Sequence, residues 1–169
     1  PAVSVASASS GRPGPGTGPG NVARDAASAG PRSAPGKPAA LRALGIKKFV
    51  GCTYFRDNKL NDLFTRYFSD GGFEVLAMEG MDTSPGEAGN VTTAQIYHHL
   101  KRSFIKHPDA QGIYLLGSGA WRVVDVVAAE EDLGVPVVHP VAARVWYVQK
   151  QLHVRQPVQA MGRLLAELP

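Results

Sequence analysis

Residues 112–140, with the sequence GIYLLGSGAWRVVDVVAAEEDLGVPVVHP, contain the pattern that decides the fold. The apolar runs at 112–116 and 135–138 are typical of strands covered on both faces, and residues 123–133 between them favour a helix. A strand, a helix and a second strand with short connections predict two parallel strands linked by a right-handed crossover.

The same alternation extends to both sides of this segment. Two further strands are predicted at 47–53 and 73–78. Helices are predicted at 39–44, 58–69, 92–106, 142–152 and 159–168. Residues 79–89, rich in Gly, Asp, Ser and Pro, are expected to form a loop. We therefore predict a three-layer α/β sandwich with a mainly four-stranded parallel sheet.

The first residues of the chain differ in composition from the rest. Residues 1–40 contain seven of the 13 prolines and seven of the 19 glycines, and no Leu, Ile, Met, Phe, Tyr or Trp. Ordering a residue costs roughly 1–2 kcal/mol in backbone entropy, and this stretch has little apolar surface to bury in return. We predict a disordered tail at 1–38 and one folded domain at 39–169.

The origin of the tail has two interpretations. It is either a linker or an out-of-frame reading of GC-rich DNA, because Ala, Gly, Pro and Arg have GC-rich codons. The chain starts at Pro1 rather than Met, so we expect a fragment or a processed product.

The formal net charge of +4 comes mainly from the tail. Residues 1–40 contain four basic side chains and one acidic one, which leaves 14 basic and 13 acidic side chains in the remainder. A nearly neutral domain lacks the basic surface that binds a nucleic-acid backbone. The sequence contains no membrane-length apolar run and no secretory signal. With one cysteine, Cys52, we expect a cytoplasmic protein that binds neither nucleic acid nor membrane.

Ligands of open parallel sheets bind beyond the carboxyl ends of the strands, so the residues that follow each strand are the candidates for function. These candidates are Thr53 and Tyr54 after the first strand, Gly117, Ser118 and Gly119 after the third, and His139 after the fourth. The glycine–serine–glycine turn opens a helix, where unpaired N–H groups and the helix dipole favour an anion. A carboxylate or an enolate oxygen suits this position.

Each candidate also has a structural interpretation. Ser118 can be a helix N-cap without any ligand. Thr53 can cap the following helix while Tyr54 packs at the rim of the sheet. His139 can act as an acid or base near neutral pH, or bond to the backbone. Cys52 is expected to be a core residue.

We expect the other titratable side chains to lie at the surface and not in a metal or catalytic cluster. Surface positions are expected for His98, His99, His107 and His153, and a solvated acidic run for Glu130, Glu131 and Asp132. The sequence has no metal-ligand spacing, dinucleotide fingerprint, phosphate-binding loop or nucleophile elbow. We therefore expect no metal site.

Three stretches carry a family resemblance: AALRALGIKKFVGCT at 39–53, the segment at 112–140 and MGRL at 161–164. In order and spacing they are similar to the second half of the maleate isomerase and arylmalonate decarboxylase branch of the aspartate/glutamate racemase superfamily. The likeness covers residues 39–166. It implies a fold of two similar α/β halves with the active site between them, of which this chain is one half.

The resemblance also implies an activity. Members of this branch are racemases, isomerases or decarboxylases that act on small carboxylic acids through an enolate, without metal or organic cofactor. The family's second-half cysteine falls on Ser118, with Gly119 in the adjoining loop of donors. A Thr-x-Tyr contact to the carboxylate falls on Thr53, although here Tyr54 comes one position early and Phe55 takes the matching place.

Two departures from the family predict weak or no turnover. A serine hydroxyl ionises far less readily than a thiol and needs a neighbouring base, for which His139 is the candidate. The half that bears the other cysteine has no counterpart in this sequence. A surface left uncovered in this way can support a homo-oligomer.

Two other functional classes fit the sequence less fully. A non-catalytic carboxylate-binding or interaction module would keep the anion site without the chemistry. A flavodoxin-like regulatory domain ranks last, because no acidic pocket follows the first strand.

Overall fold

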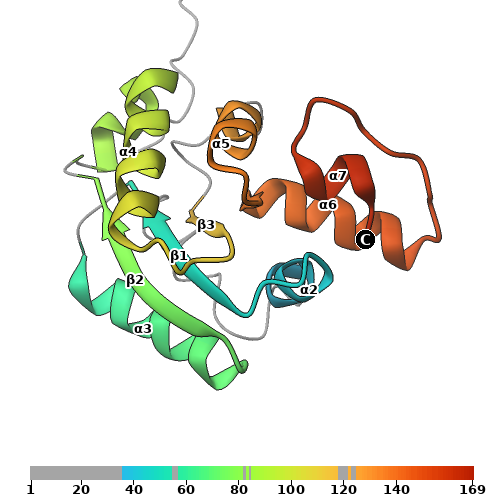
Figure 1. Cartoon of the computed structure of the whole chain (residues 1–169), viewed down its shortest axis with the longest axis horizontal. Coiled ribbons are helices and arrows are strands. Elements are labelled where there is room, and N and C mark those ends of the chain that lie inside the picture. Colours follow the sequence, from blue (N-terminus) through green and yellow to red (C-terminus); the bar gives the residue numbers. More distant parts are fainter. Residues whose placement is uncertain (1–35, 55–56, 82, 84, 118–121, 123–124) are drawn as a thin grey trace, which may run out of the picture.

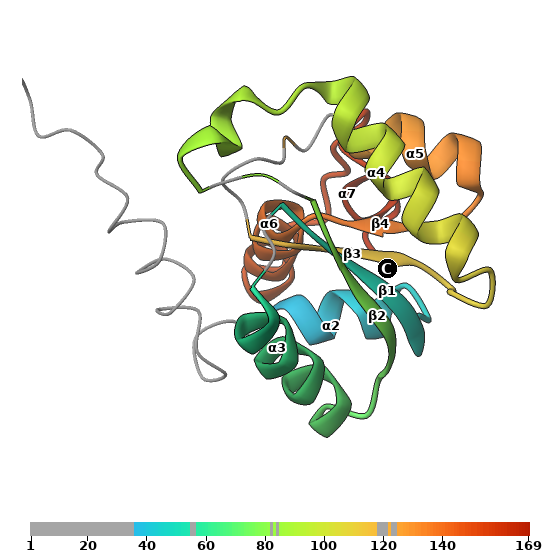
Figure 2. The same cartoon turned by 90° about the vertical axis from the view of Figure 1, so that its left-hand side faces the viewer.

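The computed structural model describes residues 36–54, 57–81, 83, 85–117, 122 and 125–169. Its four strands are β1 (Lys48–Thr53), β2 (Glu74–Gly80), β3 (Ile113–Leu116) and β4 (Val137–Val138). They lie in the order β2-β1-β3-β4, and every neighbouring pair is parallel. Figures 1 and 2 show the sheet between two layers of helices, so the predicted fold class is confirmed.

The helices divide between the two faces of the sheet. One face packs against α2 (Gly36–Ala43), α3 (Asn58–Asp70), α6 (Pro140–Gln151) and α7 (Arg163–Glu167). The other face packs against α4 (Thr93–Lys106) and α5 (Asp125–Leu133). Helix α2 begins at Gly36, within the last residues of the segment assigned to the tail, and the disorder of residues 1–35 stays a prediction.

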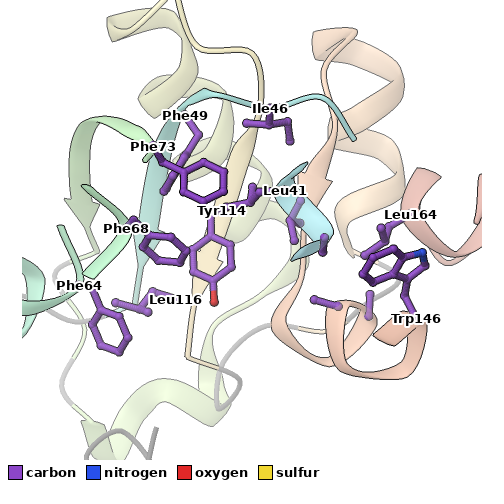
Figure 3. Packing of buried hydrophobic residues seen from close by; sticks show 14 of the residues in the cluster. Leu41, Ile46, Phe49, Phe64, Phe68, Phe73, Tyr114, Leu116, Trp146 and Leu164 are labelled. Atoms are coloured by element: carbon purple, nitrogen blue, oxygen red, sulfur yellow. The ribbon is translucent and has the colours of Figure 1, made fainter. Parts of the chain in front are cut away.

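Side chains along the central strand alternate between these two layers. Phe49 belongs to the cluster under α3, whereas Val50 and Cys52 belong to the cluster under α4. The ring of Phe68 on α3 makes edge contacts with Phe49 and Tyr114, at centroid distances of 5.1 and 4.9 Å (Figure 3). Because both faces are covered, the central strands β1 and β3 are mostly apolar, as the sequence indicated, whereas the edge strand β2 is only partly buried.

The region predicted as a loop at 79–89 is partly regular. Strand β2 continues to Gly80, and a 3₁₀ helix, η1, occupies Pro85–Asn90. The extra strand residues follow from pairing with β1, because Cys52 lies opposite Glu79 and Thr53 opposite Gly80. Pairing with a neighbour decides this strand end, and local composition cannot show it.

His99 is buried, so its expected surface position is wrong. It lies on the inner side of α4 with Ile96 and Leu100, whereas the neighbouring His98 is exposed. Its Nε2 is 3.1 Å from the main-chain oxygen of Glu79. Adjacent helical residues point in different directions, and here one of the two points into the core.

Glu130 is also buried, contrary to the predicted solvated run, whereas Glu131 and Asp132 are exposed as expected. Its Oε1 accepts a hydrogen bond from the backbone N–H of Val137 at 2.8 Å, and Oε2 accepts one from Arg163 at 2.7 Å. Burial raises the pKa of this carboxyl, and the two backbone bonds oppose the change. Glu130 therefore ties α5 to both β4 and α7.

The buried His99 should make stability depend on pH. Burial lowers its pKa from 6.5 to about 4, so the folded protein favours the neutral ring. Its stabilising contribution is complete above pH 6.5 and is lost as the pH falls from there towards 4, by about 3 kcal/mol. We expect His99→Gln to flatten the free energy of unfolding in this window, measured by urea denaturation. His153→Gln, at an exposed position, is the control, and equal pH profiles for wild type and His99→Gln would contradict the assignment.

Candidate functional site

The carboxyl ends of three strands meet at one edge of the sheet. Thr53 at the end of β1 pairs with Leu116 at the end of β3 and with Gly80 at the end of β2. Strand β4 pairs with the first half of β3, with Val137 opposite Ile113 and Val138 opposite Tyr114, and His139 follows at its carboxyl end. The end of β2 was not among the predicted strand ends of the site, because residues 79–89 were predicted to form a loop.

Tyr54 and Gly117 are in contact at this edge. Gly117 has a φ of +79°, and a Cβ placed on it would lie 2.7 Å from Cε1 of Tyr54. The Tyr54 ring is buried and joins the cluster beneath α4 and α5. Glycine is thus required at 117 for two reasons, its backbone conformation and the close ring.

Thr53 is fully buried at the same edge. Its main-chain oxygen accepts a hydrogen bond from the N–H of Met81 at 2.9 Å. Helix α3 is capped by Asp57, whose Oδ1 accepts from the N–H of Leu60 at 3.1 Å. The interpretation of Thr53 as the cap of this helix is therefore wrong, because the chain continues for four residues before the helix begins.

His139 is the N-cap of α6 and is almost fully buried. Its Nδ1 accepts a hydrogen bond from the backbone N–H of Val141 at 3.0 Å, so the backbone interpretation is confirmed. In a neutral imidazole with Nδ1 as acceptor, the proton resides on Nε2, which is then a donor. With Nδ1 engaged by the backbone, this nitrogen is not available to accept a proton from a serine.

Ser118 and Gly119 lie outside the described residues, as does Phe55. Strand β3 ends at Leu116, and Gly117 is the last described residue before the serine. The catalytic role of Ser118 and the donor role of Gly119 therefore stay predictions.

Cys52 belongs to the core rather than to this edge. Its side chain is fully buried on the α4 side of the sheet, and burial raises the pKa of the thiol to about 12. A thiol in this environment is not ionised near neutral pH and cannot serve as the family's acid or base.

Neither a cluster of metal ligands nor a membrane-length apolar helix occurs in the part of the chain that the structure describes. Within it, no three His, Cys, Asp or Glu side chains are grouped so that they could hold a metal ion. None of its helices combines the length and the apolarity that crossing a membrane requires.

Sequence comparison assigns the family. The family model for arylmalonate decarboxylase matches residues 37–165, most of the chain. This chain belongs to the arylmalonate decarboxylase family. The resemblance inferred from the sequence is thereby confirmed. No functionally curated protein matches the sequence.

Solved structures of this family and of maleate isomerases share the fold. A structure of arylmalonate decarboxylase is 24% identical, with a TM-score of 0.70, and the match covers 76% of this chain and 57% of that one. Maleate isomerase Iso from Pseudomonas putida S16 is 18% identical, with a TM-score of 0.72 and coverages of 79% and 54%. The Nocardia farcinica maleate cis-trans isomerase is 20% identical, with a TM-score of 0.70 and coverages of 88% and 62%. This chain therefore spans a little more than half the length of these enzymes.

The contact between Tyr54 and Gly117 can be tested with a matched pair of substitutions. Gly117 and Gly134 both have positive φ, but a Cβ at Gly134 meets nothing within 4 Å. Alanine at either position should cost about 1 kcal/mol for the backbone conformation. Gly117→Ala should cost a further 1–3 kcal/mol, roughly, because the methyl group overlaps a buried ring. Urea denaturation measures both, and equal losses would show that Tyr54 does not pack on Gly117.

Proposed function

We propose that this chain is the carboxylate-binding half of a cofactor-independent racemase, isomerase or decarboxylase. Its substrate class is small carboxylic acids, of the maleate, malonate or amino-acid type, which react through an enolate. The observation that carries the proposal is the convergence of Thr53, Tyr54, Gly117 and His139 at one edge of the sheet. The lone cysteine, Cys52, is free and buried, which supports a cytoplasmic location.

Reaction through an enolate requires this edge of the sheet to stabilise negative charge. Removal of a proton or of carbon dioxide from the carbon beside a carboxylate leaves an electron pair, which moves onto the carboxylate oxygens. Fixed donors aimed at those oxygens lower the barrier. We assign this role to the Thr53 hydroxyl, the Nε2–H of His139, and the N–H groups of the turn at Gly117, Ser118 and Gly119.

Ser118 sets the expected rate. One structure of the Nocardia farcinica isomerase, a variant with serine in place of one cysteine, holds a covalently bound succinylcysteine intermediate, so another cysteine forms the covalent bond in that enzyme. In this chain a serine is predicted at the family's cysteine position. The Nδ1 of His139, the candidate base, accepts a hydrogen bond from the backbone N–H of Val141 and is therefore not available to take a proton from the serine. We therefore expect little turnover.

A second candidate function is a carboxylate-binding module without catalysis. The serine at 118 favours this alternative, because it keeps a small polar side chain in the turn and removes the reactive thiol.

Replacing Ser118 separates the two functions. We expect Ser118→Cys to raise decarboxylation or α-proton exchange of small diacids by about 100-fold over the chain as it stands, since a positioned acid or base is worth this much. Ser118→Ala is the control and should stay at background. The reaction is followed by proton NMR in deuterated water, with the cysteine variant also joined to a partner half from a family member.

Each result of this experiment has a meaning. If Ser118→Cys gains nothing in either form while malonate binding persists, the module is the correct function. Turnover by the Ser118→Ala control, or no carboxylate binding by any variant, would contradict the proposed site itself.

A further inference from the structure

The outer side of α6 and the segment that follows it are apolar although they are exposed. Among the described residues, five of the seven exposed large hydrophobic side chains lie between positions 145 and 158: Val145, Val148, Leu152, Val154 and Val158. The other two, Leu63 and Ile105, lie apart on α3 and α4. Single exposed apolar side chains are normal on a protein surface, whereas a contiguous group marks an interaction surface.

Three of the five residues form one stripe along α6. Together with a half-buried valine one turn earlier, they make up the α6 seam: Val141, Val145, Val148 and Leu152. Successive members of the seam are four, three and four residues apart. Apolar residues that recur every 3.5 residues on average are typical of a helix that packs along a second helix.

The opposite side of α6 is already packed. Ala142, Ala143 and Trp146 are buried in the core cluster that α6 shares with α2 and α7. A helix that is apolar on two sides ordinarily lies between two neighbours. The described part of the chain covers one side of α6 and leaves the α6 seam exposed. Figure 1 shows α6 on the other side of the molecule from α3 and α4.

Two hydrogen bonds hold the following segment next to this helix. The N–H of Val154 donates to the main-chain oxygen of Gln149 at 2.8 Å. The Nε2 of Gln149 donates to the main-chain oxygen of Gln156 at 3.1 Å. Gln149 is the neighbour of Val148 in the seam, so the segment adds Val154 to the same exposed surface.

The charges near the α6 seam are all positive. Residues 133–166 contain no acidic side chain, whereas Arg144 and Lys150 of α6 are exposed. If two copies of α6 packed in parallel, each cation would lie level with its own counterpart, and like charges repel. In an antiparallel pair about the middle of α6, Arg144 is instead level with Gln149 of the second copy. Lys150 is then level with Ala143. The charges therefore favour an antiparallel pair.

We propose that the α6 seam is the contact surface of a symmetric dimer, in which it packs antiparallel to the α6 seam of a second copy of this chain. Val141 of each copy then meets Leu152 of the other, and Val145 meets Val148. The seam is complementary to itself in this arrangement, as a two-fold interface requires. One association removes two exposed apolar surfaces from water.

The size of the seam sets the expected affinity. Helix α6 has 12 residues, so it is about 18 Å long. A contact of this length falls in the class of small, transient interfaces, and we expect a dissociation constant on the order of 100 µM. The dimer uses no side chain assigned to the substrate and does not depend on the enolate chemistry. Its failure would leave the proposed function standing.

Sedimentation of the full chain at different concentrations tests the dimer. Between about 20 µM and 1 mM, a range that brackets the expected dissociation constant, the average mass should rise from that of a monomer towards that of a dimer. Val148→Glu and Leu152→Glu should each weaken association by about tenfold or more, because each places a carboxylate in an apolar contact. Both side chains are more than half exposed, so the fold should tolerate the change.

The matched control is Ile105→Glu, which places the same charge at an exposed apolar position on α4. It should leave association unchanged. A mass that stays that of a monomer throughout, or an equal loss for Ile105→Glu and Val148→Glu, would overturn the proposal.

A spin label tests the orientation of the two helices. Gln151 is exposed beside the seam, and the single natural cysteine, Cys52, is fully buried, so Gln151→Cys can be labelled selectively. The labelled chain is mixed with ¹⁵N-labelled wild type, so that only contacts between copies are seen. The antiparallel seam predicts the strongest broadening at the amide of Ala142. Strongest broadening at Gln151 itself, or at amides of α3 or α4, would contradict this arrangement.

Discussion

Strand β1 holds the structure together, because it is paired on both sides with parallel neighbours. Its register with β2 and β3 places Thr53 level with Gly80 and Leu116, so the residues that follow all three strands share one edge. The central strands β1 and β3 are buried on both faces, and the sheet edge at their carboxyl ends is where polar groups can meet a ligand. A shift of one residue in this register would turn Thr53 to the opposite face and move Tyr54 away from Gly117.

Much of this arrangement could be predicted from sequence, because buried strands are apolar throughout and amphipathic helices have a clear period. The segment at 112–140 alone predicts a parallel pair, and the strand ends follow from it. Long-range contacts decided the rest. Pairing with β1 extends β2 to Gly80. His99 is buried because its side of α4 packs against the sheet. Glu130 is buried where backbone N–H groups of β4 and α7 donate hydrogen bonds to its carboxylate. No local pattern reports those contacts.

The candidate site was predictable to the level of the edge but not to the level of each side chain. The sequence left open whether His139 acts as a base or bonds to the backbone, and its bond to Val141 decides for the backbone. That bond makes Nδ1 an acceptor, so the proton of the neutral ring resides on Nε2. The roles of Ser118 and Gly119 stay predictions, because both residues lie outside the described part of the chain.

The central claim is that Thr53, the turn after β3 and His139 face one carboxylate. A titration of the ¹⁵N-labelled chain with malonate, at constant ionic strength, tests it most directly. The account predicts saturable shifts with one dissociation constant at the amides of Thr53, Gly117, Gly119 and Val141, and none at Lys48 or Ile113 at the other ends of the same strands. Shifts confined to only one of the strand ends, or stronger at Lys48 and Ile113, would contradict it.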